Sequence, residues 1–141
     1  MKACFVYTSL TGNTKAIIDM INQEMLSSGI ETKVYKIKDL SYDTLTSYDY
    51  LIIGTYTFGN GVLPKEMRPL YDYFSRVNMP SLKTAIVGTG DRFYPYFCGA
   101  VDQLVEPLKQ HTDLRVTMKV ELYPEEKDKV KIPRLIHSLT K

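Results

Sequence analysis

Residues that cross-link chains or hold metals are scarce in this sequence. It has only two cysteines and two histidines among its 141 residues. Cys4 lies in an apolar run and Cys98 in an aromatic one, and two cysteines form neither a disulfide framework nor a metal-ligand set. We therefore expect both thiols to be reduced, no metal to be bound, and His111 and His137 to lie on solvated faces without a function.

Long apolar runs and an excess of charge of one sign are also missing. No run approaches the roughly 18 apolar residues of a membrane span, and the N-terminus lacks the apolar region and cleavage site of a signal peptide. We therefore expect a cytoplasmic protein. The net charge is only +2, and the basic residues are scattered apart from a cluster between Lys127 and Arg134. This disfavours nucleic-acid binding, and the cluster is most simply a solvated helix face, with docking of an acidic partner as the alternative.

The overall composition is that of an ordinary globular domain. Apolar residues make up 44% of the chain and charged residues 24%, which excludes disorder. A chain of this length buries about two-thirds of its unfolded surface around one core. We expect a single domain over residues 1–141.

Short apolar runs alternate with segments of helical periodicity along the chain. We expect strands over residues 3–8, 32–37, 50–55, 83–89 and 114–122, and helices over residues 13–28, 67–77, 101–108 and 125–139. Pro64 suits the first position of the second helix, Pro107 is expected to kink the third, and Pro133 interrupts the last. The alternation predicts an α/β fold, with a parallel sheet, right-handed crossovers and helices on both faces.

The loop after the first strand carries hydroxyl groups and a glycine directly before a helix. It reads Thr8, Ser9, Leu10, Thr11, Gly12, Asn13 and Thr14. The N–H groups at a helix N-terminus favour an anion, and four hydroxyls add donors. The lysine and glycine spacing of a P-loop is missing, so a monophosphate is favoured over a triphosphate with magnesium. The alternative is a polar turn in which Thr11 or Asn13 caps the helix.

The loops after the third and fourth strands place aromatic residues beside glycines. They contain residues 55–61 (Thr-Tyr-Thr-Phe-Gly-Asn-Gly) and 90–97 (Gly-Asp-Arg-Phe-Tyr-Pro-Tyr-Phe). Exposed aromatic side chains in neighbouring loops are costly unless a ligand covers them, and a planar ring stacked between the loops would do so. A phosphate beside a flat aromatic ring describes FMN. The alternative is that Phe93, Tyr96 and Phe97 anchor the loop in the core, which is favoured for Phe97, whereas Phe58 and Tyr94 are favoured as ligand contacts.

These three loops closely resemble those of the flavodoxins, and the resemblance covers roughly residues 3–110. Residues 9–14 resemble the family's phosphate loop, residues 57–61 its Thr-Trp-Gly-Asp loop, and residues 90–102 its second flavin loop. The resemblance implies a flavodoxin-like, doubly wound, five-stranded parallel sheet with strand order 2-1-3-4-5. The length of the chain is similar to that of the short-chain branch.

The resemblance also implies which residues bind FMN. Phe58 would stack on the inner face of the isoalloxazine and Tyr94 on the outer face, while Asp91 would border the pyrimidine end and Tyr96 the ribityl chain. The expected contacts come from Thr8, Ser9, Leu10, Thr11, Gly12, Asn13 and Thr14; from Thr55, Tyr56, Thr57, Phe58, Gly59, Asn60 and Gly61; and from Gly90, Asp91, Tyr94, Tyr96, Phe97 and Cys98.

The chain departs from the family in charge and at two loop positions. Phe58 and Asn60 stand where many relatives carry tryptophan and aspartate, and most relatives are strongly acidic. Lys65, Arg68 and Arg92 lie in or beside the flavin loops. We expect Arg92 and Lys65 to make the potential for the second electron less negative than in acidic relatives.

The resemblance implies a low-potential one-electron carrier that moves electrons between a flavodoxin reductase and acceptor proteins. We expect a monomer with transient partners that is not an enzyme, because the carrier role needs no acid, base or nucleophile. We hypothesise that the Gly59–Asn60 peptide turns its carbonyl toward flavin N5 and stabilises the neutral semiquinone.

Three other functions are compatible with parts of the sequence. A flavodoxin-like activator of the class Ib (manganese) ribonucleotide reductase shares the fold, FMN and a similar first loop, but its other loops match less well. An FMN-dependent reductase with a small-molecule substrate would oxidise NAD(P)H steadily. A signalling receiver domain needs an aspartate at the end of the third strand, where Gly54 and Thr55 stand.

Overall fold

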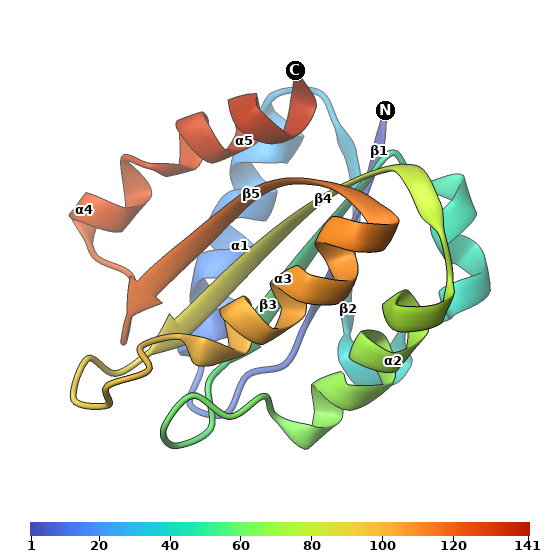
Figure 1. Ribbon diagram of the computed structural model, residues 1–141. Helices are drawn as coiled ribbons and strands as arrows, with labels where there is room; N and C mark the ends of the chain where they lie inside the picture. Colours follow the sequence, from blue (N-terminus) through green and yellow to red (C-terminus); the bar gives the residue numbers. More distant parts are fainter.

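A central parallel sheet organises the molecule (Figure 1). The computed structural model describes residues 1–141. Its strands are β1 (Lys2–Tyr7), β2 (Glu31–Lys36), β3 (Tyr50–Tyr56), β4 (Met79–Gly90) and β5 (Thr112–Glu121). They pair in the order β2-β1-β3-β4-β5, and every pair is parallel. The expected fold class is confirmed.

Helices cover both faces of this sheet. They are α1 (Asn13–Ser27), α2 (Arg68–Arg76), α3 (Gly99–His111), α4 (Glu126–Lys129) and α5 (Ile132–Thr140), with 3-10 turns η1 (Ile37–Asp39), η2 (Tyr42–Ser47) and η3 (Lys65–Met67). Helices α1 and α5 pack on one face, and α2 and α3 on the other (Figure 1). None of the helices is long and apolar enough to pass through a membrane.

The sheet divides the apolar core into two layers. In β1, Ala3, Phe5 and Tyr7 belong to the layer under α1 and α5, while Cys4 and Val6 belong to the layer under α2 and α3. Successive side chains of a strand point to opposite faces, so a strand covered on both faces must be apolar throughout. This requirement explains the continuous apolar runs of the inner strands.

The C-terminal helix expected over residues 125–139 is wrong in one respect, because the structure has two short helices there. Helix α4 begins with a capping box, in which the Glu125 N–H donates to the Asp128 carboxylate at 2.9 Å. Pro133 lies in the first turn of α5, where its missing N–H costs nothing. The chain therefore stops and restarts its helix around Lys131 instead of continuing through the proline.

The start of the second helix also differs from the prediction. Pro64 precedes the 3-10 turn η3 instead of opening the helix, and Pro69 occupies the first turn of α2. Val77 lies beyond the last helical residue. Pro107 lies within α3, and β4 begins earlier than expected, at Met79.

The carboxyl ends of β1, β3 and β4 meet at one edge of the sheet. Tyr7 pairs with Gly54, and Gly54 pairs with Val87, so the three strands end nearly level. Figure 1 shows the three following loops, in blue, green and gold, at the same end of the molecule. The fold thus brings together the loops that the sequence analysis selected.

We expect Gly88→Ala to destabilise the protein by about 1–3 kcal/mol, because a Cβ at position 88 would overlap Cγ2 of Val101 on α3. Chemical denaturation of the purified protein measures the change. The double variant Gly88→Ala/Val101→Ala should lose less stability than the sum of its single variants, since removing the valine methyls clears the overlap. Additive losses would show that contact with Val101 is not the reason why position 88 requires glycine.

Candidate functional site

The loop after β1 is shaped to present backbone N–H groups at the start of α1. Gly12 is the N-cap residue and has a left-handed backbone with φ of 95°. The Ser9 hydroxyl oxygen accepts hydrogen bonds from the N–H groups of Gly12 at 3.2 Å and Lys15 at 3.3 Å. No side chain of Thr11 or Asn13 caps the helix, so the alternative of a polar capping turn is wrong in the residues it named, and the Ser9 hydroxyl accepts the N–H groups there instead.

Several donors of this loop have no partner within the chain. They are the N–H groups of Leu10, Thr11, Asn13 and Thr14. The first turn of α1 contains no acidic side chain. Unpaired N–H groups and the positive end of the helix dipole together favour an anion. The arrangement suits a phosphate group.

The four hydroxyls of the loop differ in their availability, which the sequence analysis did not anticipate. Thr8 donates to a carboxylate oxygen of Glu66 at 3.1 Å. Thr14 is buried, and its hydroxyl pairs with that of Thr89 at 2.7 Å. The hydroxyl protons of Ser9 and Thr11 are therefore the ones left for a ligand, and Thr14 can contribute through its N–H group.

The loop after β3 is a tight, closed turn. The N–H groups of Phe58 and Val62 donate to each other's carbonyl oxygens at 2.8 and 3.0 Å. Gly59 and Gly61 have φ values of 52° and 88°, which glycine adopts most easily. The Gly59 carbonyl accepts the N–H of Gly61 at 3.1 Å. The hypothesised turn of the Gly59–Asn60 peptide therefore has to break this hydrogen bond.

Helix α3 and the segment before it hold this turn in place. The Asn60 side-chain oxygen accepts the Tyr96 N–H at 3.2 Å, and the Gln103 amide donates to the Gly61 carbonyl at 2.8 Å. A Cβ on Gly99 would lie 2.6 Å from Gly61 Cα, so the two backbones touch. The sequence analysis missed Gln103. Its position four residues after Gly99, on the same face of a helix, was the available signal.

The hydroxyl of Thr57 and that of Thr55 also have partners within the chain. Thr57 Oγ1 accepts the Ala100 N–H at 3.3 Å, which is a second hydrogen bond between this loop and α3 itself. Thr55 is buried and donates to the Tyr56 carbonyl at 2.8 Å. Thr55 can thus contact a ligand only through its backbone.

The aromatic residues of the third loop fall into two groups. Phe93, Tyr94 and Tyr96 are 82%, 39% and 66% exposed, so the alternative that Phe93 and Tyr96 anchor the loop in the core is wrong. Phe97 packs against the core under α2 and α3, as that alternative predicted for it. The Arg92 guanidinium lies 4.3 Å from the centre of the Phe97 ring.

Charged and polar groups set the shape of the loop after β4. The Asp91 carboxylate accepts the Phe93 N–H at 2.9 Å, and Arg92 forms an ion pair with Glu121 at 3.5 Å. Cys98 is buried at the start of α3, and its thiol donates to the Val120 carbonyl at 3.8 Å. The Cys98 side chain therefore faces the core, and only its backbone can border a ligand.

Glu66 is the second residue that the sequence analysis missed. One oxygen of its carboxylate accepts the hydroxyls of both Thr8 and Tyr56, at 3.1 and 2.8 Å. Burial acts to raise the pKa of this carboxyl, but the hydrogen bonds from Tyr56, its own backbone and Thr8, together with the Lys65 charge, lower it below its usual value. Glu66 is therefore an anion at neutral pH and lies between two surface hollows of about 470 and 500 Å³.

Comparison with known proteins agrees with this geometry. The chain matches the sequence model of the flavodoxin family over residues 5–129. The chain belongs to the flavodoxin family. It is 39% identical to probable flavodoxin 1 of Bacillus subtilis (strain 168) over 127 residues, which are 88% of this chain and 80% of that protein. As a flavodoxin it is a flavin-dependent electron carrier, and a ribonucleotide reductase activator or a substrate-reducing enzyme is not favoured.

Solved structures of flavodoxins share the fold. A short-chain flavodoxin associated with a PDU bacterial microcompartment superposes with a TM-score of 0.93 at 22% identity, covering 99% of this chain and 96% of that one. A mutant Fusobacterium nucleatum flavodoxin bound to flavin mononucleotide superposes with a TM-score of 0.67 at 20% identity, covering 84% of this chain and 67% of that one. The flavodoxin sheet order and helix layers are thus present here.

Burial should keep both cysteine thiols of this flavodoxin protonated, and the free energy of unfolding should therefore fall at high pH. Burial raises the pKa of Cys4 to about 12 and that of Cys98 to about 11. The stability that these two neutral thiols contribute is fully present below pH 9, and it is lost as the pH rises through their folded-state pKa values. We expect the free energy of unfolding to fall above pH 9, with a smaller slope in Cys4→Ala. Each group can contribute up to about 1.4 kcal/mol per pH unit, and an unchanged slope would contradict the assignment.

Proposed function

We propose that the flavin carried by this chain is FMN, and that the three loops at the carboxyl edge of the sheet hold it. Two features found together support this proposal. The N–H groups at the start of α1 have no partner, and the loops after β3 and β4 carry exposed aromatic rings. FMN combines a phosphate with a planar aromatic ring, which are the two groups that such a surface would bind. The Fusobacterium nucleatum flavodoxin with bound flavin mononucleotide gives further support.

In this proposal the phosphate lies against the loop of residues 9–14. The N–H groups of Leu10, Thr11, Asn13 and Thr14 and the hydroxyls of Ser9 and Thr11 would donate to it, since these groups have no acceptor in the chain. The helix dipole of α1 adds a favourable potential. Riboflavin, which has no phosphate, should bind less tightly than FMN.

The planar ring would lie between the loops of residues 55–61 and 90–98. Phe58 is 61% exposed and Tyr94 is 39% exposed, and stacking on both faces of a flavin would cover these apolar surfaces. Asp91, Tyr96 and the glycines would border the ring and the ribityl chain. Thr55 and Cys98 would contribute backbone groups only, because their side chains are buried.

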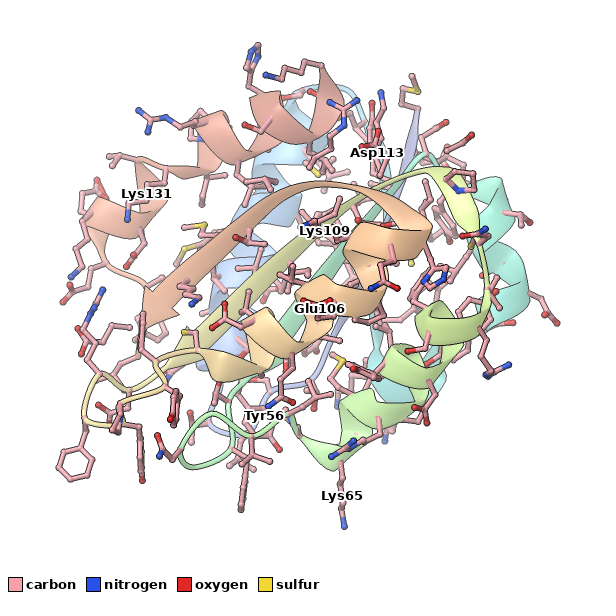
Figure 2. The ribbon with its side chains drawn as sticks, viewed as in Figure 1. Tyr56, Lys65, Glu106, Lys109, Asp113 and Lys131 are labelled. Carbon is pink, nitrogen blue, oxygen red and sulfur yellow. The ribbon has the colours of Figure 1, made fainter.

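When bound, FMN supplies the electron-accepting ring, and the residues around it set how easily the ring is charged. Apolar walls from Phe58 and Tyr94 would exclude water and disfavour a negative charge on the ring. Lys65 lines the same hollow as Phe58, forms no ion pair, and extends into solvent (Figure 2). Its positive charge would oppose that effect.

The carrier role itself needs transient contact with a reductase and with acceptor proteins. We propose that the protein works in the cytoplasm as a single-domain monomer and turns over no substrate of its own. Two free, buried cysteines are consistent with a reducing compartment. Steady NAD(P)H oxidation by the isolated, FMN-loaded protein would contradict the absence of an enzymatic role.

Loss of either stacking ring should weaken FMN binding. We expect Phe58→Ala and Tyr94→Ala each to raise the dissociation constant of FMN about tenfold or more, because a stacked aromatic pair is worth about 0.5–1.5 kcal/mol beyond its buried area. Quenching of flavin fluorescence during titration of the apoprotein measures the constant. The control is Phe93→Ala, which removes a ring from the loop that also carries Tyr94. It should change the dissociation constant of FMN less than twofold. An equal effect of all three variants would contradict the assigned stacking positions.

Removing the Lys65 charge should shift the redox potential of the bound flavin. We expect Lys65→Gln to make the potential for the second electron more negative, since a cation beside the ring stabilises its anionic reduced form. A spectroelectrochemical titration measures the shift. The control is Lys109→Gln, which removes the same charge from the last turn of α3. Equal potentials in the two variants would show that Lys65 has no special effect.

A further inference from the structure

The carboxylate of Glu66 links two loops that are far apart in the sequence. Thr8 follows β1 and Tyr56 ends β3, and these strands are neighbours in the sheet. The Thr8 hydroxyl at 3.1 Å and the Tyr56 hydroxyl at 2.8 Å donate to the same carboxylate oxygen, Oε2. Glu66 itself belongs to the turn η3, so a third segment supplies the link.

Each loop joined by this link holds a different part of the proposed ligand. Thr8 directly precedes the loop whose free N–H groups suit the phosphate. Tyr56 lies two residues before Phe58, whose exposed ring is the proposed inner stacking surface. Figure 2 shows Tyr56 at the end of the molecule where the loops gather. A group that fixes Thr8 and Tyr56 relative to each other also fixes the two subsites.

The hydrogen bonds are of a strong type. A charged acceptor strengthens a hydrogen bond to roughly twice that of a neutral pair. Burial and the Glu66 bond together raise the pKa of Tyr56 to about 12, so this hydroxyl keeps its proton and remains a donor. The side chain of Glu66 remains solvent-accessible, so the link can respond when a ligand fills either loop.

We propose that Glu66 is a positioning residue that couples the phosphate subsite to the ring subsite, so that filling one subsite raises the affinity of the other. This inference rests on the proposed FMN site. A ligand in the phosphate loop would fix Thr8, and through Glu66 it would fix Tyr56 and the turn that carries Phe58. The ring would then bind to a surface that is already ordered, and it would lose less free energy to ordering.

The negative charge of Glu66 cannot by itself favour FMN binding. A carboxylate near a phosphate is repelled by it, so the anion weakens FMN binding unless its hydrogen bonds contribute more. Charge and link can be separated, because both bonds end on one oxygen. Glu66→Gln keeps a carbonyl oxygen as an acceptor for both hydroxyls and removes the charge, whereas Glu66→Ala removes both.

The coupling can be measured with two ligands that each fill one subsite. Riboflavin is titrated into the apoprotein with and without saturating inorganic phosphate, and the ratio of its dissociation constants gives the coupling. We expect phosphate to tighten riboflavin binding in the wild-type protein and, to a smaller extent, in Glu66→Gln, whose neutral oxygen accepts weaker hydrogen bonds. In Glu66→Ala the ratio should fall to about 1, and the dissociation constant of FMN should rise about tenfold, as expected for loss of bonds to a charged group.

Control variants separate the link from general effects. Glu106→Ala removes an exposed, unpaired carboxylate from α3 (Figure 2) and should leave the ratio unchanged. Thr8→Val and Tyr56→Phe each break one of the two bonds without altering Glu66. Each should lower the ratio, and combining them should add little, because either break interrupts the link. These two variants also test the coupling if Glu66→Ala does not fold.

The outcomes distinguish this inference from the proposed function. A wild-type ratio of 1, or an unchanged ratio in folded Glu66→Ala, would overturn the coupling role while FMN binding stands. Loss of the ratio in Glu66→Gln as well as in Glu66→Ala would assign the effect to charge and also overturn it. A wild-type protein that binds neither FMN nor riboflavin would overturn both the inference and the proposed function.

Discussion

The parallel pairing of β1, β3 and β4 is the constraint on which the site depends. Parallel strands that end nearly level deliver their following loops to one edge of the sheet. The phosphate loop, the glycine turn and the aromatic loop are separated by tens of residues in sequence, yet they form one surface for this reason. Apolar packing on both faces of the sheet maintains the pairing, so the core determines the geometry of the site.

Electrostatics at this edge differ from those of a strongly acidic flavodoxin. The phosphate loop contains no acidic side chain, and Lys65 adds an unpaired cation beside the proposed ring position. Arg92, by contrast, is partly neutralised by Glu121 and lies over Phe97. Glu66 brings one anion to the boundary between the two subsites, where two hydroxyls stabilise it. Lys65 and Arg68 line the same hollow as Phe58 and form no ion pair, so the uncompensated positive charge at the proposed ring position is expected from these two residues.

The sequence alone predicted the architecture and selected three loops that the sheet brings together, but it did not predict the contacts within these loops. Short apolar runs and helical apolar patterns located every strand, α1 and α3, because burial of a strand on both sheet faces or of one stripe of a helix leaves a local signature. The last helix was misjudged because the chain ends α4 at Lys129 and begins α5 at Ile132, with Pro133 in the first turn of α5. Apolar periodicity continues through this break and does not reveal it.

Contacts between distant residues were beyond the reach of local patterns. Thr8 and Thr14 looked like free hydroxyls in the loop, yet their partners are Glu66 and Thr89, which lie 58 and 75 residues away. Gln103 and Glu66 carry no motif, and their importance follows only from the neighbours that the sheet order gives them. The same long-range contacts decide which atoms of the loops remain available to a ligand.

The most direct test maps the FMN site by amide NMR of the isotopically labelled apoprotein during a titration with FMN. The account predicts saturable shifts for one FMN per chain, largest at the N–H groups of residues 10–14, 57–61 and 90–98. Shifts confined to another surface, such as the hollow beside Leu45 and Leu82 at the opposite edge of the sheet, or no shifts at all, would contradict it.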